Sequence, residues 1–251
     1  MSARLTFDDL VVSYPAPGGI TLPALGAIRT TIEAGEFVAL VGPSGSGKST
    51  LLRVIAGLLQ PSVGMVLIDD EAITQPSKRV AIMFQDANLM PWRTVTENIA
   101  LPLELAGLGK DERTQAAQGL LPRLGLADFP DAYPSELSGG MAQRVALGRV
   151  LIQRPDVLLL DEPFGALDAM TRERISQDLI KLWMQERQTV VMVTHDINEA
   201  VLLSDRVLVL SQRPGQIVGD YRVPLERPRT PDVMYSEAFG ETAHKVRAAI
   251  Q

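Results

Sequence analysis

The chain has 251 residues, of which 46% are hydrophobic, enough for a sizeable core in one large domain or two modest ones. Its net charge of −6 argues against a nucleic-acid partner that is held by phosphate neutralisation. The absence of cysteine excludes disulfides, thiolate metal sites and cysteine nucleophiles. No apolar run approaches the roughly 20 residues that span a bilayer, and the first residues do not resemble a signal peptide. We therefore expect a cytosolic protein. If it works with a membrane, we expect it to do so from beside the bilayer, without spanning it.

The predicted strands fall into two groups. Residues 5–14 and 26–33 alternate in polarity like an antiparallel ribbon. Five later runs are almost continuously apolar or β-branched, which is typical of strands buried on both faces of a parallel sheet. These runs are residues 37–41, 80–84, 157–160, 190–193 and 206–210.

Helical patterns alternate with these strands, at residues 48–59, 139–153, 169–186 and 197–204. This alternation predicts an α/β fold with helices covering a largely parallel sheet. Between residues 86 and 137 the strand signal disappears, and residues 101–108 and 113–124 are predicted to be helices of an insertion. We assign residues 1–212 to one domain, with a helical subdomain at about 86–153, and residues 213–251 to a C-terminal extension on the core. That extension ends in a predicted helix at residues 241–250.

A glycine-rich loop joins the strand at 37–41 to the helix that follows it. The segment has the phosphate-loop spacing GxxxxGK[ST], and its backbone N–H groups are expected to surround phosphates. Lys48 is expected to reach the outer phosphates and to assist catalysis, and Ser49 to supply a hydroxyl to Mg²⁺. The predicted loop residues are Gly42, Pro43, Ser44, Gly45, Ser46, Gly47, Lys48, Ser49 and Thr50.

Three other buried strands also end in polar groups, and the carboxyl ends of parallel strands share one edge of a sheet. Asp161 is placed to hold Mg²⁺ through water, and Glu162 to polarise an attacking water. His195 is predicted to belong to the same catalytic edge, and the Gln85 amide to reach both Mg²⁺ and that water. Each of these residues also has a purely structural alternative. The acidic pair could simply precede a helix, the histidine could pack in the core or cap a helix, and the glutamine could belong to a turn at the end of its strand.

A second segment, SELSGG at 135–140, also resembles a phosphate-binding helix start. Ser138, Gly139 and Gly140 precede a helical pattern, but no second Lys-Ser/Thr pair accompanies them. The segment therefore cannot form an independent ATP site, and the economical interpretation is that it completes the site of another copy. Two chains would then pack head to tail around two ATP molecules.

Six motifs occur in a characteristic order: GPSGSGKST, Gln85, LSGGM, VLLLDEP, GALD and THD. Together they resemble the motif set of an ATP-binding cassette ATPase over nearly the whole chain. The stretches LMPWRTVTENI and THDINEAVLLSDRVLVLSQRPGQI resemble the ATPase subunits of nitrate/sulfonate/taurine-type bacterial importers.

The resemblance implies a P-loop NTPase with a mostly parallel core, an N-terminal antiparallel β subdomain and an inserted helical subdomain. It implies that Tyr14 stacks on adenine, although an ordinary strand-end aromatic is the alternative. Asp168 is assigned to the nucleotide site and is also expected to be the N-cap of the next helix.

The resemblance also implies partners. These are a second copy or a paralogous ATPase, membrane permease subunits and, indirectly, a solute-binding protein, at the cytoplasmic face of the membrane. Import, and a cargo such as nitrate, a sulfonate, taurine or another small solute, are implied in the same way. The apolar segment 88–92 is interpreted as a socket for a permease helix; alternatively, Trp92 packs into the helical insertion.

The sequence departs from the family pattern at three positions. Met141 follows the two glycines where glutamine is usual, Ala142 stands where a polar residue is common, and Gly165 replaces a frequent serine.

Two other functions share part of the pattern. A small-molecule kinase shares the phosphate loop but does not account for LSGG or His195, and a non-transport cassette ATPase would need coiled-coil, tandem or basic features.

Overall fold

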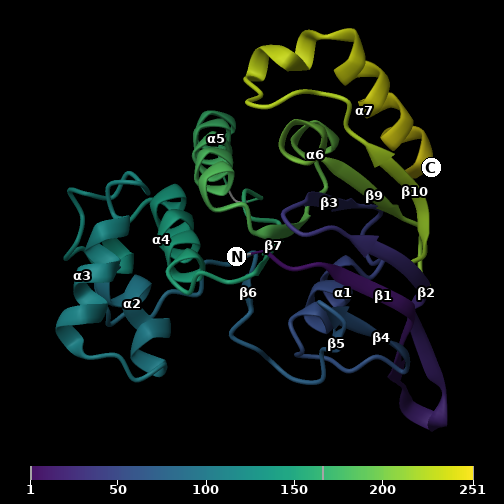
Figure 1. Ribbon diagram of the computed structural model, residues 1–251, viewed down its shortest axis with the longest axis horizontal. Helices are drawn as coiled ribbons and strands as arrows, with labels where there is room; N and C mark the ends of the chain where they lie inside the picture. The colour runs from purple at the N-terminus through teal and green to yellow at the C-terminus, as the bar shows by residue number, and fades with distance from the viewer. Residues whose placement is uncertain (1, 166, 251) are drawn as a thin grey trace.

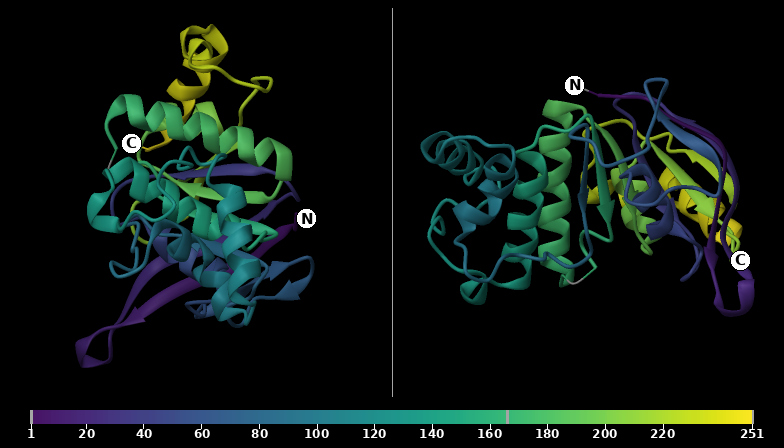
Figure 2. Two further views of the ribbon diagram at one scale, coloured as in Figure 1. Left: turned by 90° about the vertical axis from the view of Figure 1, so that its left-hand side faces the viewer. Right: turned by 90° about the horizontal axis from the view of Figure 1, so that it is seen from below.

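Two β-sheets form the centre of the chain in the computed structural model, which describes residues 2–165 and 167–250. The smaller sheet is antiparallel and has the strand order β2-β1-β4-β5. Its strands are β1 (Leu5–Pro15), β2 (Thr21–Ile32), β4 (Val63–Ile68) and β5 (Glu71–Ala72). The hairpin of β1 and β2 extends away from the rest of the molecule (Figure 2). The N-terminal antiparallel ribbon is thus confirmed, with two strands that the sequence did not predict.

The larger sheet has the strand order β10-β9-β3-β8-β7-β6. All its pairings are parallel except that of β9 with β10. Its strands are β3 (Phe37–Val41), β6 (Val80–Met83), β7 (Val157–Asp161), β8 (Thr189–Val193), β9 (Arg206–Leu210) and β10 (Ile217–Arg222). The five predicted buried strands are therefore confirmed, and β10 adds an antiparallel edge.

Both faces of the larger sheet are buried, because alternate residues of a strand point in opposite directions. In β3, Phe37 and Ala39 face a core shared with α4, α5, α6 and α7. Val38 and Leu40 face a second core, between the two sheets, which also contains the apolar side of α1. Continuous apolar strands are the consequence of this three-layer arrangement.

Apart from α1, which contributes to the core between the two sheets, the helices are arranged in two groups (Figure 1). α2, α3 and α4 lie together on one side, away from the antiparallel sheet, whereas α5, α6 and α7 lie over the larger sheet. Their bounds are α1 (Lys48–Ile55), α2 (Val95–Leu105), α3 (Lys110–Leu120), α4 (Gly139–Leu151), α5 (Ala169–Glu186), α6 (Ile197–Leu203) and α7 (Glu237–Ile250). The α/β class with an antiparallel subdomain and a separate helical group is as predicted. The domain boundaries at about 86–153 and at 212 stay predictions.

Two helices begin earlier than the sequence analysis placed them. α2 begins at Val95 rather than at 101, behind a capping box in which the Thr94 hydroxyl and the Glu97 carboxylate each accept the other residue's backbone N–H. Pro102 lies inside this helix, not at its start. α7 begins at Glu237 rather than at 241.

The segment after β10 completes the core around an aromatic pair. The rings of Phe37 and Trp183 meet edge to face at 5.5 Å, and the Arg227 guanidinium lies 4.5 Å from the Trp183 ring centroid. Arg227 also donates to Asp205 Oδ1 at 2.7 Å and to the Leu203 carbonyl. These contacts attach the C-terminal segment to the first residue of β3.

Across the described ranges 2–165 and 167–250, no helix is both long enough and apolar enough to cross a bilayer.

Candidate functional site

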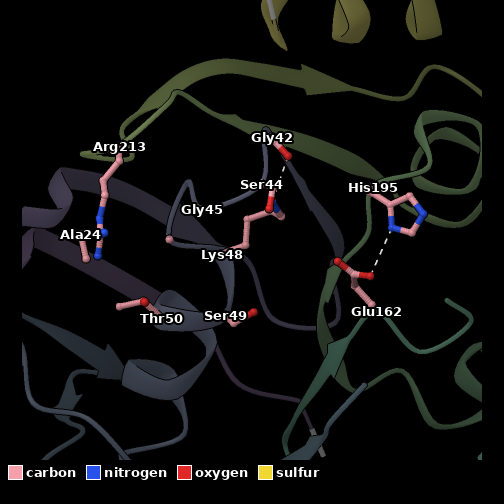
Figure 3. Close-up of a pocket in the computed structure, with 11 residues that line it drawn as sticks. Ala24, Gly42, Ser44, Gly45, Lys48, Ser49, Thr50, Glu162, His195 and Arg213 are labelled. Carbon is pink, nitrogen blue, oxygen red and sulfur yellow. Dashed lines mark hydrogen bonds and ion pairs between the residues drawn. The ribbon is translucent and has the colours of Figure 1, made fainter. Parts of the chain in front are cut away.

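A cavity of about 490 Å³ opens at the carboxyl edge of the larger sheet (Figure 3). Four strand ends contribute to it: the loop after β3, the acidic residue after β7, the histidine after β8 and the arginine on the turn after β9. Its lining residues are Ala24, Gly42, Ser44, Gly45, Gly47, Lys48, Ser49, Thr50, Glu162, His195 and Arg213. The structure therefore brings together residues that lie far apart in the sequence, as the strand-end argument predicted for β3, β7 and β8, whereas Gln85 after β6 is not among the lining residues.

The loop after β3 leaves the start of α1 free to bind an anion. Gly47, the N-cap residue, has φ +94° and provides no side-chain cap, so the first N–H groups of α1 have no side-chain partner there. Gly42 (φ +153°) is required because a Cβ there would lie 2.5 Å from the Leu210 carbonyl oxygen. The loop can thus wrap closely around a phosphate.

Lys48 lies over this loop. Its ammonium donates to the carbonyl oxygens of Gly42 and Pro43 at 2.9 and 2.8 Å. Burial lowers the pKa of Lys48, while Glu162 and Asp161 act in the opposite direction. The Lys48 ammonium is therefore held against the phosphate loop at the wall of the cavity, and its contact with an outer phosphate stays a prediction.

Ser49 and Asp161 bring two side-chain oxygen groups together beside Lys48. The Ser49 hydroxyl donates to Asp161 Oδ1 at 3.2 Å, which links α1 to the end of β7. Burial raises the pKa of Asp161, with the Ser49 hydrogen bond opposing that shift. A half-buried carboxylate next to a hydroxyl fits Mg²⁺, which takes few protein oxygens and keeps water and phosphate ligands.

Glu162 and His195 meet across the cavity from the phosphate loop. Glu162 Oε2 lies 3.2 Å from His195 Nδ1. Glu162 has φ +45°, a left-handed conformation that is uncommon for glutamate and is often found at functional sites. Its backbone N–H donates to the Val193 carbonyl at 3.0 Å, which fixes this turn against the end of β8. The side chain thereby projects toward the phosphate loop.

Behind this pair lies a partly buried carboxylate that the sequence analysis did not single out. Glu199 on α6 lines a small pocket together with Glu162 and His195. Burial raises the pKa of Glu199 to about 7, and a hydrogen bond from Thr194 opposes the shift. No short motif marks such a residue, because its environment is created by packing.

Several predicted site residues are not among those that line the cavity, namely Tyr14, Pro43, Ser46, Gln85, Ser138, Gly139, Gly140, Asp161 and Asp168. The Gln85 side chain is exposed, and its backbone oxygen accepts a hydrogen bond from Gln143 Nε2 at 2.8 Å. The Tyr14 hydroxyl lies 3.2 Å from Thr50 Oγ1, so that this half-buried ring is next to a lining residue. The metal role of Gln85 and the adenine role of Tyr14 stay predictions.

The LSGG segment also lies outside the cavity lining. Ser138 is the N-cap of α4 and accepts a hydrogen bond from the Met141 backbone N–H at 3.3 Å. Ser138 and Gly139 are exposed, whereas Gly140 is buried. The chain therefore does not apply this helix start to its own phosphate loop.

The GALD motif leads into α5. Asp168 is the N-cap of α5, as expected, and accepts from the Thr171 backbone N–H at 3.0 Å. Hydrogen bonds from Thr171 lower the pKa of Asp168. Ala166 lies outside the described residues, and the assignment of Asp168 to the nucleotide stays a prediction.

The segment 88–92 has a fixed shape and an exposed tip. Trp92 is 70% exposed, so the alternative in which it packs into the helical insertion is wrong. The buried amide of Asn98 accepts a hydrogen bond from the Met90 N–H and donates one to the Met90 carbonyl. Arg149 donates to the Asn88 and Ala87 carbonyls. Trp92 is thus exposed on a loop whose backbone is held by side-chain hydrogen bonds.

Arg213 and Ala24 are lining residues that the sequence analysis missed. Arg213 follows β9, whose carboxyl end lies beside that of β3 in the sheet. The same strand-end argument, applied to this fifth strand, would have identified it.

The fold and this cavity define a P-loop protein that binds and hydrolyses a nucleotide. Residues 25–165 match the family described as ABC transporter. The chain is 46% identical over 91% of its length to an uncharacterized ABC transporter ATP-binding protein, MJ0412 of Methanocaldococcus jannaschii, covering 85% of that protein. It is 45% identical over 95% of its length to the aliphatic sulfonates import ATP-binding protein SsuB of Bacillus cereus, covering 92% of that protein.

Solved structures agree with this assignment. The ATP-binding cassette MJ0796, in a dimeric post-hydrolysis state bound to ADP and Pi, superposes with a TM-score of 0.78. The two are 34% identical, and the match covers 88% of this chain and 100% of that one. The chain belongs to the ABC transporter family, and it is an ATPase.

Proposed function

We propose that this chain is the ATP-hydrolysing subunit of an importer for a small solute, working as a head-to-tail dimer beneath membrane permease subunits. The observation that carries the proposal is the divided site. The phosphate loop lines an open cavity, while Ser138 and Gly139, which are exposed at the start of α4, lie outside the lining of that cavity on the same chain. A second copy, or a paralogous ATPase, would supply the missing cover for each cavity.

The cavity residues account for the hydrolysis step. Lys48 and the free N–H groups of α1 hold the outer phosphates of ATP, where negative charge must be stabilised. Glu162, in contact with His195, orients and polarises the attacking water. Since phosphoryl transfer needs positioning and charge stabilisation more than covalent chemistry, these groups suffice for transfer to water.

Ser49 and Asp161 would hold Mg²⁺, Ser49 directly and Asp161 through water. The ion supplies charge neutralisation at the phosphate oxygens when it is bound. In this proposal, the amide of Gln85, which is exposed on the loop that follows β6, also approaches this ion.

ATP would close the dimer because it makes contacts that only the closed state offers, namely those with the partner's LSGG segment. Hydrolysis removes these contacts and allows the halves to separate. The motion would reach the permease through the loop 88–92 and its exposed Trp92. This places the ATPase at the cytoplasmic face of the membrane.

The cargo is proposed to be a small solute such as a sulfonate, nitrate or taurine. The relative SsuB, named for aliphatic sulfonate import, supports the sulfonate member of this set. Nothing in the cavity contacts the cargo in this scheme, because a solute-binding protein and the permease select it.

The test is a crosslink from residue 88 in the assembled complex. A photoactivatable probe at Asn88, which is exposed, should crosslink to a co-purified permease subunit. The same probe at the exposed Asp111, on α3, is the matched control and should give little crosslink. Co-purification with no crosslink from residue 88 would contradict the permease contact, and failure of any membrane subunit to co-purify would contradict the importer.

A further inference from the structure

Arg213 is a charged residue of the cavity that none of the sequence motifs explains. It lies on the turn between β9 and β10 and lines the cavity beside Ala24, on the side opposite Glu162 and His195 (Figure 3). Within residues 2–165 and 167–250, no hydrogen-bond or ion-pair partner faces its guanidinium. The cation is therefore available to a ligand.

The turn that carries Arg213 is fixed in place by backbone hydrogen bonds. Ser211 N–H donates to the Gln216 carbonyl at 2.9 Å, and Gln216 N–H donates to Ser211 Oγ at 3.0 Å. Gly215 is attached to β2: its N–H donates to the Ala24 carbonyl at 3.0 Å, and its carbonyl accepts from Gly26 N–H at 2.9 Å. The turn thus has a set position relative to the antiparallel sheet.

The same turn contacts the phosphate loop. A Cβ on Gly215 would lie 1.9 Å from the Ser46 carbonyl oxygen, so only glycine allows this approach. Ser46 itself is buried within the loop. Gly215, which makes this contact with the phosphate loop, is only two residues after Arg213. The packing of the turn therefore fixes the backbone of Arg213 close to the phosphate loop.

The direction of the site indicates which phosphate Arg213 faces. Lys48 reaches the outer phosphates of a nucleotide in a phosphate loop, and Glu162 and His195 lie at the end where the terminal phosphate reacts. Arg213 lies at the other end of the cavity, beside Ala24 and on the side opposite Glu162 and His195 (Figure 3). A cation there is complementary to the phosphate next to the ribose.

We propose that Arg213 pairs with the α-phosphate of bound ATP. Its planar guanidinium can donate two parallel hydrogen bonds to the oxygens of one phosphate, a geometry that lysine cannot reproduce. The inference rests on the proposed nucleotide site. Because the α-phosphate takes no part in the reaction, the pair would bind ATP and ADP equally and would affect KM rather than kcat.

The experiment is a competition assay with Arg213→Ala. ATP, ADP, AMP and adenosine each displace a fluorescent ATP analogue from the purified chain. We expect the affinities for ATP, ADP and AMP to fall about tenfold, the usual range for loss of a charge-assisted hydrogen bond, and that for adenosine to stay unchanged. KM for ATP should rise by a similar factor with kcat within about twofold. Arg213→Lys should give an intermediate loss.

Gln212→Ala is the matched control, since Gln212 is an exposed neighbour in the same turn and does not line the cavity. Unchanged ATP and ADP affinities in both Arg213 variants, or an equal loss for adenosine, would overturn the α-phosphate contact. Lys48→Ala separates this failure from a failure of the site itself. If Lys48→Ala also binds ATP normally, the nucleotide site is wrong; if it alone loses binding, only the role of Arg213 is wrong.

Discussion

Two helices of this chain begin at glycine-containing segments, but their first turns differ. α1 starts after Gly47 with no side-chain cap and opens into the cavity. α4 starts after Ser138, whose hydroxyl accepts the Met141 N–H, and both Ser138 and the first helical residue, Gly139, are exposed. An uncapped helix start inside a cavity can serve a ligand of its own chain, whereas a capped and exposed one is stable without a ligand. In our proposal, the second kind of start serves the ATP of another chain.

Among the substitutions that test this difference between the two helix starts, Glu162→Gln is expected to have the largest effect. The substitution keeps the size of the side chain but removes the charge that polarises water, so turnover should fall about a thousandfold while ATP still binds. The two helix starts should then remain on either side of unhydrolysed ATP. Size-exclusion chromatography with ATP should show a dimer, and with ADP a monomer.

Two results together would contradict this assignment: persistent hydrolysis by the Glu162→Gln chain, and only monomers in the presence of ATP.

A smaller effect is expected for Ser138→Arg. This substitution tests whether the start of α4 serves the ATP of another chain. A bulky cation at the start of α4 should prevent the partner from covering the cavity, so ATPase activity should fall about a hundredfold. The affinity of the single chain for ATP should not change, because Ser138 does not line its own cavity. Ser135→Arg, in the exposed stretch just before the motif, is the control.

Wild-type activity of the Ser138→Arg chain would count against a site shared between two chains.

The smallest effect concerns the stability of the isolated chain. Ser138→Ala removes the cap of α4 and should lower the free energy of unfolding by about 1 kcal/mol, measured by urea denaturation without nucleotide. Thr94→Ala, which removes the cap of α2, is the comparison and should cost a similar amount. No loss in Ser138→Ala beside a clear loss in Thr94→Ala would mean that the α4 cap does not stabilise the free chain.

Most of the core could be predicted from the sequence because its strands are short, apolar and contiguous. β3 and β9 have the predicted bounds, and their alternate burial in two cores explains the continuous apolar runs. β4 and β10 were missed because each contains glycine, and β4 in particular has Gly64 in a left-handed conformation (φ +73°). The start of α2 was misplaced because Pro102 suggests a first turn, although the sequence TVTE at 94–97 is a capping-box signal.

In the candidate site, too, some residues could be predicted from local sequence, whereas others depend on tertiary packing. The phosphate loop was predictable because its glycines, Lys48 and Ser49 are contiguous, and Glu162 and His195 because they end parallel strands. Arg213 depends on the packing of a turn against Ser46, and the pKa of Glu199 depends on burial by neighbouring elements. Such relations arise only from tertiary structure, so no local pattern encodes them.

The contact of Arg227 with Trp183 has a consequence for how the last 39 residues, 213–251, can be studied. Deleting them would uncover the indole and leave β9 with an unpaired edge, a combination that favours association between chains. A shortened chain would therefore tend to precipitate, and its inactivity would say nothing about regulation. Point substitutions on the outer surface of α7 are the informative way to ask what this part of the chain does.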